Sequence, residues 1–537
     1  MSRPIAYFCA EYALSDKLQI YAGGLGVLAG DYVREAGDSG LPLVAVGLYY
    51  SEGFVHKELS PEGRIVDLHE GCSPEEVGLY LAKDERGEEV KISIPIGQSI
   101  VWVRVWVYEY KSVKVYLLDT KVAENSAEDQ HITDTLYITD KEVRFKQEMV
   151  LGIGGLRALL AMGVHPAFYH LNEGHSGLLI YELIHHEMQE HSLSFEEARA
   201  KARERILFTN HTLVAAGNDV FSNDLAALML AKYSQEIAIP VKQLVDLGLV
   251  QQSSSFSMTM LAMRAAGKIN AVSKLHGEKA KEIWTDHPMT YVTNGIHLPT
   301  WDKVGDKDMW AQHRENKRAL LKEISERTGT VWEDRALLLG WGRRMASYKR
   351  PLAIVERLKQ FGEMARDANR PVHVIFAGIS HPADQDGQKL LEELQYRLVS
   401  DLKGVAVYMP HYNLELSSLM TAGCDVWINT PVVGFEACGT SGMKAALNGD
   451  LPFSTRDGWM AEVEMYGLGW GLPDNDLTEK MIEILNNDIV PLYYDQNEKG
   501  VPEKWVAMMQ NARELIKNEF SMTRAMKQYL ELIVPLA

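Results

Sequence analysis

The sequence lacks most of the features that mark specialised protein classes. Its 537 residues include four cysteines, none of them in a C-x-x-C pair or at metal-site spacing, so we expect neither a disulfide framework nor a metal site. No run approaches 18 uninterrupted apolar residues, so we expect no transmembrane helix. The short apolar run at 5–10 lacks a cleavage pattern, so we expect no signal peptide. These absences predict a cytoplasmic protein without a membrane partner.

Positive charge is also scarce. The chain has 55 Lys and Arg against 73 Asp and Glu, which gives a net charge of −18. Nucleic-acid binding rests on many cations at phosphates, so this balance argues against a nucleic-acid partner. A local basic cluster must hold any bound anion against the overall negative field. The hydrophobic content of 46% and the charged content of 24% are ordinary for a globular protein and exclude wholesale disorder.

Strand-like and helix-like segments alternate along the chain, and the length fits two large α/β domains. This alternation predicts βαβ units and parallel sheets, that is, two Rossmann-like domains facing a cleft. The expected strands are 5–12, 42–50, 167–172, 206–209, 337–340, 372–377, 405–409 and 426–429. The β-branched segments at 90–96, 100–110 and 113–118 predict an antiparallel insertion in the first domain. Asn-Gly and Pro within 290–300 mark the expected crossing between domains 1–295 and 296–515.

Two short clusters are suited to anions. Gly23–Gly26 follows a strand and opens a helix, where free amides can bind an anion, although structural turns explain about half of such clusters. The segment 343–350 places Arg343, Arg344, Lys349 and Arg350 after the strand at 337–340. Open α/β sheets bind ligands at this end of their strands, and Arg and Lys bind phosphate. The alternative is a solvated basic face at a helix start.

The stretch from Glu436 to Asn448 is the most informative. Its Gly-Thr-Ser-Gly turn enters a helix at about Ser441 and forms another candidate phosphate cradle, with Lys444 on the first helical turns. A lysine desolvated among apolar neighbours has a lowered pKa, as Schiff-base chemistry requires. Taken singly, a lysine at position 444 would most often be an ordinary exposed lysine.

This stretch, E-A-C-G-T-S-G-M-K-A-A-L-N, resembles the signature of the pyridoxal-phosphate-dependent α-glucan phosphorylases. Further stretches are similar to other blocks of that family, in the same order: 23–26, 170–175, 209–212, 293–296 and 344–350. The resemblance covers about 5–465 and is to a short form of the family. It implies a glycosyltransferase-B-like fold, with 516–537 as a C-terminal helix that crosses back. The implied reaction is reversible phosphorolysis of α-1,4-glucans, a retaining glycosyl transfer that gives glucose 1-phosphate.

The resemblance also implies roles for individual residues. Lys444 would carry pyridoxal 5′-phosphate as a Schiff base, and its phosphate would be surrounded by Thr440, Ser441 and Arg343, with Tyr412 nearby. Inorganic phosphate would be bound by Arg344, Lys349 and the Gly24 amide. The glucosyl unit would contact Leu25, Glu173, His211, Asn294, Glu436 and the amides of Cys438 and Gly439. We group His211 with Lys444, Arg344 and Lys349 as the expected catalytic residues.

Two alternatives stay open at this point. A nucleotide-sugar-dependent α-glucan synthase would share the fold and the glycine loop. Such enzymes usually carry a second glutamate eight residues after the first, where this chain has Lys444. A degenerate glucan-binding protein would have lost its cations, whereas Arg344, Lys349 and Lys444 are present. The sequence implies no allosteric regulation, and a homodimer is our working hypothesis for the assembly.

Overall fold

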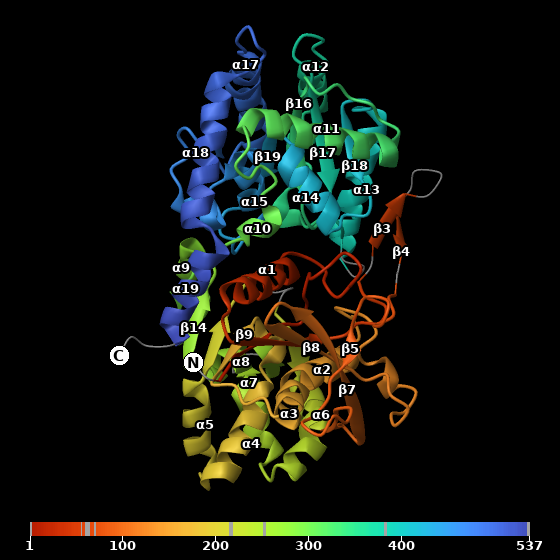
Figure 1. The fold of residues 1–537 in the computed structure, drawn as a ribbon, viewed down its shortest axis with the longest axis vertical. Helices are drawn as coiled ribbons and strands as arrows, with labels where there is room; N and C mark the ends of the chain where they lie inside the picture. Colours follow the sequence, from red (N-terminus) through yellow and green to blue (C-terminus); the bar gives the residue numbers. More distant parts are fainter. Residues whose placement is uncertain are drawn as a thin grey trace.

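A computed structural model describes residues 3–54, 56–59, 65–68, 71–213, 218–250, 254–380 and 384–533. The chain builds two layered halves, each a largely parallel sheet covered by helices, one below and one above in Figure 1. This confirms the predicted mixed α/β class with parallel sheets. In the described residues no helix is both long enough and apolar enough to cross a membrane.

The first sheet has the strand order β15-β14-β10-β9-β1-β2-β8-β7-β5, with β6 beside β7. Pairing is parallel from β15 to β8 and antiparallel among β5, β6, β7 and β8. The strands are β1 (Ile5–Phe8), β2 (Leu43–Leu48), β5 (Tyr80–Leu81), β6 (Lys91–Ile96), β7 (Ser99–Tyr110), β8 (Val113–Asp119), β9 (Phe168–Asn172), β10 (Ile206–Thr209), β14 (Lys268–Ala271) and β15 (Thr290–Tyr291).

The strand β8 departs from the prediction, which kept 113–118 outside the parallel core. It pairs with β7 in antiparallel fashion on one side and with β2 in parallel fashion on the other. The reason lies in its burial, since Val115, Leu117 and Leu118 are fully buried. A strand covered on both faces joins the core, whatever the direction of its hairpin partner.

Helices cover both faces of the first sheet (Figure 1). They are α1 (Gly24–Ser39), α2 (Lys141–Met149), α3 (Gly155–Ala161), α4 (Leu179–His191), α5 (Phe195–Glu204), α6 (Asn223–Glu236), α7 (Val241–Gly248), α8 (Met258–Ala265) and α9 (Lys274–Ile283). Two small antiparallel sheets accompany them, β11 (Val220–Ser222) with β12 (Leu249–Val250) and β13 (Ser255–Ser257), and β3 (His56–Leu59) with β4 (Ile65–Leu68).

The second sheet is parallel throughout, in the order β18-β17-β16-β19-β20-β21. Its strands are β16 (Leu337–Gly342), β17 (Val372–Ala377), β18 (Ala406–Met409), β19 (Val426–Asn429), β20 (Leu451–Thr455) and β21 (Trp470–Leu472). Its helices are α10 (Leu298–Trp301), α11 (Met309–Thr328), α12 (Leu358–Ala365), α13 (Gln385–Ser400), α14 (Leu414–Gly423), α15 (Ser441–Asn448), α16 (Leu477–Ile484), α17 (Val490–Tyr494) and α18 (Glu503–Glu519).

The chain passes between the halves twice, and the two passages lie side by side. A β-bridge joins Ile296 to Ser521, and the Arg524 guanidinium donates to the carbonyl oxygens of Thr293 and Asn294 at 2.6 and 2.9 Å. The last helix, α19 (Met522–Ile533), then packs on α1 and buries Met522 and Tyr529 in the core of the first half. The second passage therefore anchors helix α19 on the first half of the molecule.

Candidate active site

The parallel part of each sheet reverses its strand order at one point, and the predicted site residues follow the strands at those two points. In the second sheet the order reverses between β16 and β19, and these strands are followed by Arg343 and by the segment 430–440. In the first sheet it reverses between β1 and β9, which are followed by the glycine loop and by Glu173. Ligands of open α/β sheets bind at such positions.

The helix α1 brings the two reversal points together. It lies at the boundary of the halves, directly below α10 in Figure 1. The Asp16 carboxylate, just before it, accepts from the Leu414 N–H at 3.0 Å and so caps α14 in the second half. Val27 on α1 packs against the second core. The glycine loop between these residues thus lies at the junction.

A compact cation cluster lies after β16. Arg343 Nη2 is 2.7 Å and Lys349 Nζ 2.8 Å from the same Glu436 oxygen, Oε2. Burial would raise the pKa of Glu436, but the two cations lower it to about 2. Burial, together with Arg343, lowers the pKa of Lys349 to about 8. The cluster keeps one positive charge in excess inside a strongly acidic chain, which suits an anionic ligand.

The Arg343 guanidinium can donate a further hydrogen bond. Among the described residues, its buried Nη1 has no hydrogen-bond partner. A Cβ added to Gly439 would lie 3.2 Å from Arg343 Nη2 and 3.3 Å from Glu436 Oε1, so the main chain before α15 abuts the cluster. A buried donor without a partner beside a helix N-terminus fits an anion at this position.

Lys444 is buried on α15, which excludes the ordinary exposed lysine. Its Nζ lies 4.0 Å from the centroid of the Trp301 ring. Burial lowers the pKa of Lys444 to about 8, against the opposing effect of Asp31. Thr440 and Ser441 precede it at the start of α15, and the Ser441 hydroxyl accepts from Trp427 Nε1 at 3.3 Å. The amine is therefore partly neutral near physiological pH and able to act as a nucleophile.

Tyr412 and Arg344 differ in how they relate to this cluster. The Tyr412 hydroxyl donates to the Gly342 carbonyl at 3.3 Å, which places it at the end of β16 beside Arg343. The Arg344 side chain is 55% exposed and lies 3.9 Å from Asp384, at the N-cap of α13. Arg344 thus pairs with Asp384 rather than with Glu436, and it acts on the cluster only through its charge, which helps to lower the pKa of Lys349.

The glycine loop is held by a residue that the sequence did not single out. Glu11 Oε2 accepts from the Ala22 N–H at 2.7 Å and from the Gly23 N–H at 3.1 Å, and Tyr137 donates to Oε1 at 2.7 Å. A Cβ on Gly26 would lie 2.8 Å from Glu11 Oε2, whereas one on Gly24 meets nothing within 4 Å. Glu11 thus fixes the first loop amides and leaves Gly24 facing open space.

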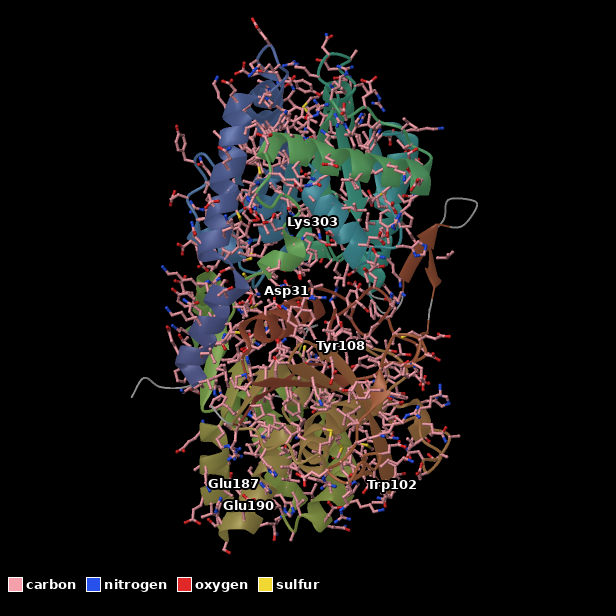
Figure 2. All side chains as sticks on the ribbon, in the orientation of Figure 1. Asp31, Trp102, Tyr108, Glu187, Glu190 and Lys303 are labelled. Carbon is pink, nitrogen blue, oxygen red and sulfur yellow. The ribbon has the colours of Figure 1, made fainter. Side chains whose placement is uncertain are left out.

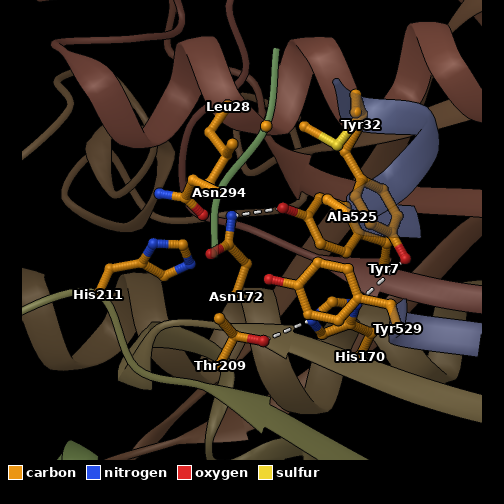
Figure 3. Close-up of a pocket in the computed structure, with 12 residues that line it drawn as sticks. Tyr7, Leu28, Tyr32, His170, Asn172, Thr209, His211, Asn294, Ala525 and Tyr529 are labelled. Atoms are coloured by element: carbon orange, nitrogen blue, oxygen red, sulfur yellow. Dashed lines mark hydrogen bonds between the residues drawn. The ribbon is translucent and has the colours of Figure 1, made fainter. Parts of the chain in front are cut away.

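Neutral polar groups gather on the side of the first sheet. His211 and Asn294 line one small cavity, shown in Figure 3. The His211 N–H donates to Glu173 Oε2 at 2.8 Å, and Asn294 Nδ2 donates to the Cys438 carbonyl at 3.2 Å. Burial raises the pKa of Glu173 to about 8 and lowers that of His211 well below its usual range. The hydrogen bond to Cys438 joins this group to the segment that carries Gly439 and Lys444.

The residues present fit a carbonyl cofactor that carries a phosphate. Lys444 offers a buried amine, and Arg343 offers an unpartnered donor beside the N-terminus of α15. The described residues contain no group of three or more His, Cys, Asp or Glu placed to hold a metal ion.

Besides Glu11, the sequence analysis missed Asp31, Trp301 and Asp457. The Asp457 carboxylate accepts from the Glu436 N–H at 2.8 Å and so fixes the main chain at Glu436. Trp301 packs on Lys444 and donates to Asp31. Glu11 and Asp457 each lie shortly after the end of a strand, β1 and β20, which is a position typical of site residues, whereas no local signal marks Asp31 or Trp301.

Comparison with known proteins places these motifs in a family. Residues 299–468 match the family model described as carbohydrate phosphorylase. Over 98% of its length, the chain is 34% identical to the maltodextrin phosphorylase of Thermococcus litoralis and covers 70% of that protein. It is 31% identical to the glycogen phosphorylase of Aquifex aeolicus, and the match covers 98% of this chain and 85% of that protein. An uncharacterized protein of Methanocaldococcus jannaschii is 30% identical over 98% of this chain and 99% of its own.

Proposed function

Because the chain belongs to the carbohydrate phosphorylase family, we propose that it catalyses the reversible phosphorolysis of α-1,4-glucans. The reaction removes the glucosyl unit at the non-reducing end, with retention, and gives glucose 1-phosphate. The observation that carries this proposal is the Arg343–Lys349–Glu436 cluster next to the helix of Lys444. Phosphorolysis requires phosphate to be held by cations and oriented amides in a buried site.

Lys444 and the start of α15 would hold pyridoxal 5′-phosphate. The amine would bind the aldehyde end, and Thr440, Ser441 and Arg343 would bind the phosphate, with Tyr412 beside them. When bound, this cofactor supplies a phosphate group that can relay a proton to the substrate phosphate. The buried Arg343 Nη1, which has no partner among the described residues, supports this assignment.

Inorganic phosphate would be bound by Lys349, Arg344 and the Gly24 amide. Lys349 supports this role with a buried amine whose charge is only partly neutralised by Glu436. Gly24 supports it with open space at its Cα. The assignment of Arg344 rests on the sequence resemblance alone.

The glucosyl unit would lie between the neutral groups of the first half and Glu436. His211, Asn294, Glu173 and Leu25 would contact it from one side, and Glu436 with the Cys438 and Gly439 amides from the other. Neutral hydrogen-bonding groups bind hydroxyls without the desolvation cost of a charge. The Asn294–Cys438 hydrogen bond supports this placement because it joins the two sets.

The finer architecture belongs to the same proposal. We assign the active site to the junction of domains 1–295 and 296–515 in a glycosyltransferase-B-like fold, with an antiparallel insertion in the first domain and 516–537 crossing back. We further propose a cytoplasmic homodimer. The synthase alternative is not favoured, since Lys444, where a synthase has its ribose-binding glutamate, is buried against Trp301.

The experiment that tests the proposal is Lys444→Ala in the purified holoenzyme. We expect loss of the bound chromophore and loss of phosphate-dependent glucose 1-phosphate release from maltodextrin. Lys303→Ala, which changes an exposed lysine close to α10, is the matched control and retains both. Activity that persists in Lys444→Ala without bound cofactor would contradict the proposal.

A further inference from the structure

A buried carboxylate, Asp31, lies on the face of α1 that meets the second half. It is 1% exposed, and Figure 2 shows it at the junction, below Lys303. Trp301 Nε1 donates to both carboxylate oxygens at 2.9 Å, and the His297 N–H donates to Oδ2 at 3.4 Å. Residues of the second half thus supply these hydrogen bonds, which a charge removed from water requires.

The Trp301 ring connects this carboxylate to the Lys444 amine. The indole N–H points at Asp31, while Lys444 Nζ lies 4.0 Å from the centroid of the same ring. The carboxylate and the amine therefore occupy two positions around one side chain. Charges interact strongly in such buried surroundings, because water does not screen them.

The charged groups around this pair are few. Arg34 Nη1, on α1, lies 3.6 Å from Asp31 Oδ1. The His297 ring is directed to Asp38, at 3.3 Å, and Asp302 is paired with Arg513 of α18 at 2.6 Å. Within the described residues, Asp31 and Arg34 are the charges that act on the pKa of Lys444, in opposite directions.

We propose that Asp31 is a positioning residue for the Lys444 amine. Its carboxylate, held through Trp301, favours the protonated amine and so sets the pH range in which Lys444 is free to attach a carbonyl compound. Attachment is a condensation of the neutral amine with an aldehyde, and it releases water. The identity of that aldehyde as pyridoxal 5′-phosphate rests on the proposed function, whereas the charge coupling between Asp31 and Lys444 does not.

The test is a titration of the Lys444 amine in the full chain after removal of carbonyl cofactor. Formaldehyde with a borane reductant methylates neutral amines, and peptide mass spectrometry reads the extent at Lys444 at each pH. We expect a midpoint near 8 in the parent protein. In Asp31→Asn the midpoint falls by about one pH unit, because an opposite charge is lost. Labelling at pH 7 then becomes about fivefold faster.

Two further variants separate charge from disruption of the fold. Arg34→Gln removes a cation and is expected to move the midpoint upward, so the two variants shift it in opposite directions. Asp38→Asn removes a negative charge from the same helix, where the carboxylate pairs with Lys111 at 2.8 Å, and leaves the midpoint unchanged.

Three results would overturn the inference. They are an unchanged midpoint in Asp31→Asn, shifts of the same sign in Asp31→Asn and Arg34→Gln, and a Lys444 that resists methylation at every pH while Lys303 reacts. A chain that shows the expected shifts but binds no pyridoxal 5′-phosphate would refute the proposed function and leave the coupling intact.

Discussion

On the side of the second sheet, Arg343 and Lys349 share the carboxylate of Glu436 and hold its pKa at about 2, although burial opposes them. On the side of the first sheet, hydrogen-bond donors rather than an ion pair oppose burial at Glu173, and they do not outweigh it. Burial raises the pKa of Glu173 to about 8 and keeps the His211 ring neutral. The junction thus joins an ionic surface to a neutral one.

This difference is the one expected if, as we propose, the ionic side binds phosphate and the neutral side binds the glucosyl unit. Binding phosphate requires fixed charge, which a protein keeps in a buried site only by pairing it. Binding sugar hydroxyls requires directed donors and acceptors, and neutral groups supply these at a smaller desolvation cost. Substitutions on the ionic side (Arg343, Lys349 and Glu436) should therefore alter kinetic parameters for phosphate. Substitutions on the neutral side (Glu173 and His211) should alter those for glucan.

The largest effect is expected from Glu436→Gln, which leaves Arg343 and Lys349 buried without a shared anion. We expect kcat/KM to fall at least 100-fold, about 3 kcal/mol or more. The free energy of unfolding should fall by about 3–5 kcal/mol, as for a broken buried ion pair. Added orthophosphate should restore part of that stability, because it replaces the lost anion.

Denaturant titrations with and without orthophosphate measure this effect. Glu464→Gln is the control, since its side chain is 93% exposed. If Glu436→Gln and the parent protein are equally stable, the ion pairs of Glu436 with Arg343 and Lys349 do not stabilise the fold.

A smaller effect is expected from His211→Ala on the neutral side. Loss of one or two hydrogen bonds to the glucosyl unit, at about 1–3 kcal/mol in total, should lower kcat/KM for maltodextrin about 5–150-fold. The KM for phosphate should stay within about twofold, because no charge is removed. Steady-state kinetics with each substrate varied in turn checks this split, with His186→Ala on α4 as the control. If the KM for phosphate rises as much as the KM for glucan, the neutral side is not specific to glucan binding.

The pH dependence sharpens the same comparison. Burial and Arg343 lower the pKa of Lys349 to about 8, so this cation loses its proton as the pH rises through 8. The value of kcat/KM for phosphate should then fall about tenfold per pH unit above 8, since this parameter reports the free enzyme. In Lys349→Arg the charge persists, and the alkaline limb should disappear even if the maximum is lower. If the fall in kcat/KM above pH 8 is unchanged in Lys349→Arg, the titrating group is not Lys349.

The last comparison concerns the stability of the glycine loop, with no change expected in the binding groups themselves. Gly26→Ala places a Cβ 2.7 Å from Tyr21 Cβ and 2.8 Å from Glu11 Oε2. We expect a loss of about 1–3 kcal/mol in unfolding free energy from this overpacking. Gly24→Ala, whose Cβ meets no atom within 4 Å, is the matched comparison and should change stability by less than about 0.5 kcal/mol. Equal losses in chemical denaturation would mean that Glu11 does not fix the loop.

The sequence predicts regular structure best where an apolar run is bounded by turn residues. The strands at 206–209, 372–377 and 426–429 agree with the structure at both ends. The segment 113–118 was assigned to the wrong environment, because its parallel partner β2 lies far away in the chain. Hairpin patterns are local, whereas pairing across a sheet is not.

The same limit applies to the site. Glycine turns and cation clusters are contiguous in sequence, so Gly24, Arg343, Lys349 and Lys444 could be singled out. Asp31 could not, because a single acid in a helical pattern is usually solvated, and its partner Trp301 lies 270 residues away. The predicted neighbours Arg343 and Arg344 point to different surroundings, which depends on the local backbone rather than on residue type.

The proposed function depends above all on whether Lys444 holds pyridoxal 5′-phosphate beside the cation cluster. Intact mass and peptide mapping of the purified protein, before and after borohydride reduction, test it directly. We expect reduction to fix the mass of one cofactor to the chain, the added mass to map to Lys444, and the visible absorption to be lost at the same time. A colourless protein that gains no mass on reduction, or that gains it at another lysine, would show that Lys444 does not hold the cofactor.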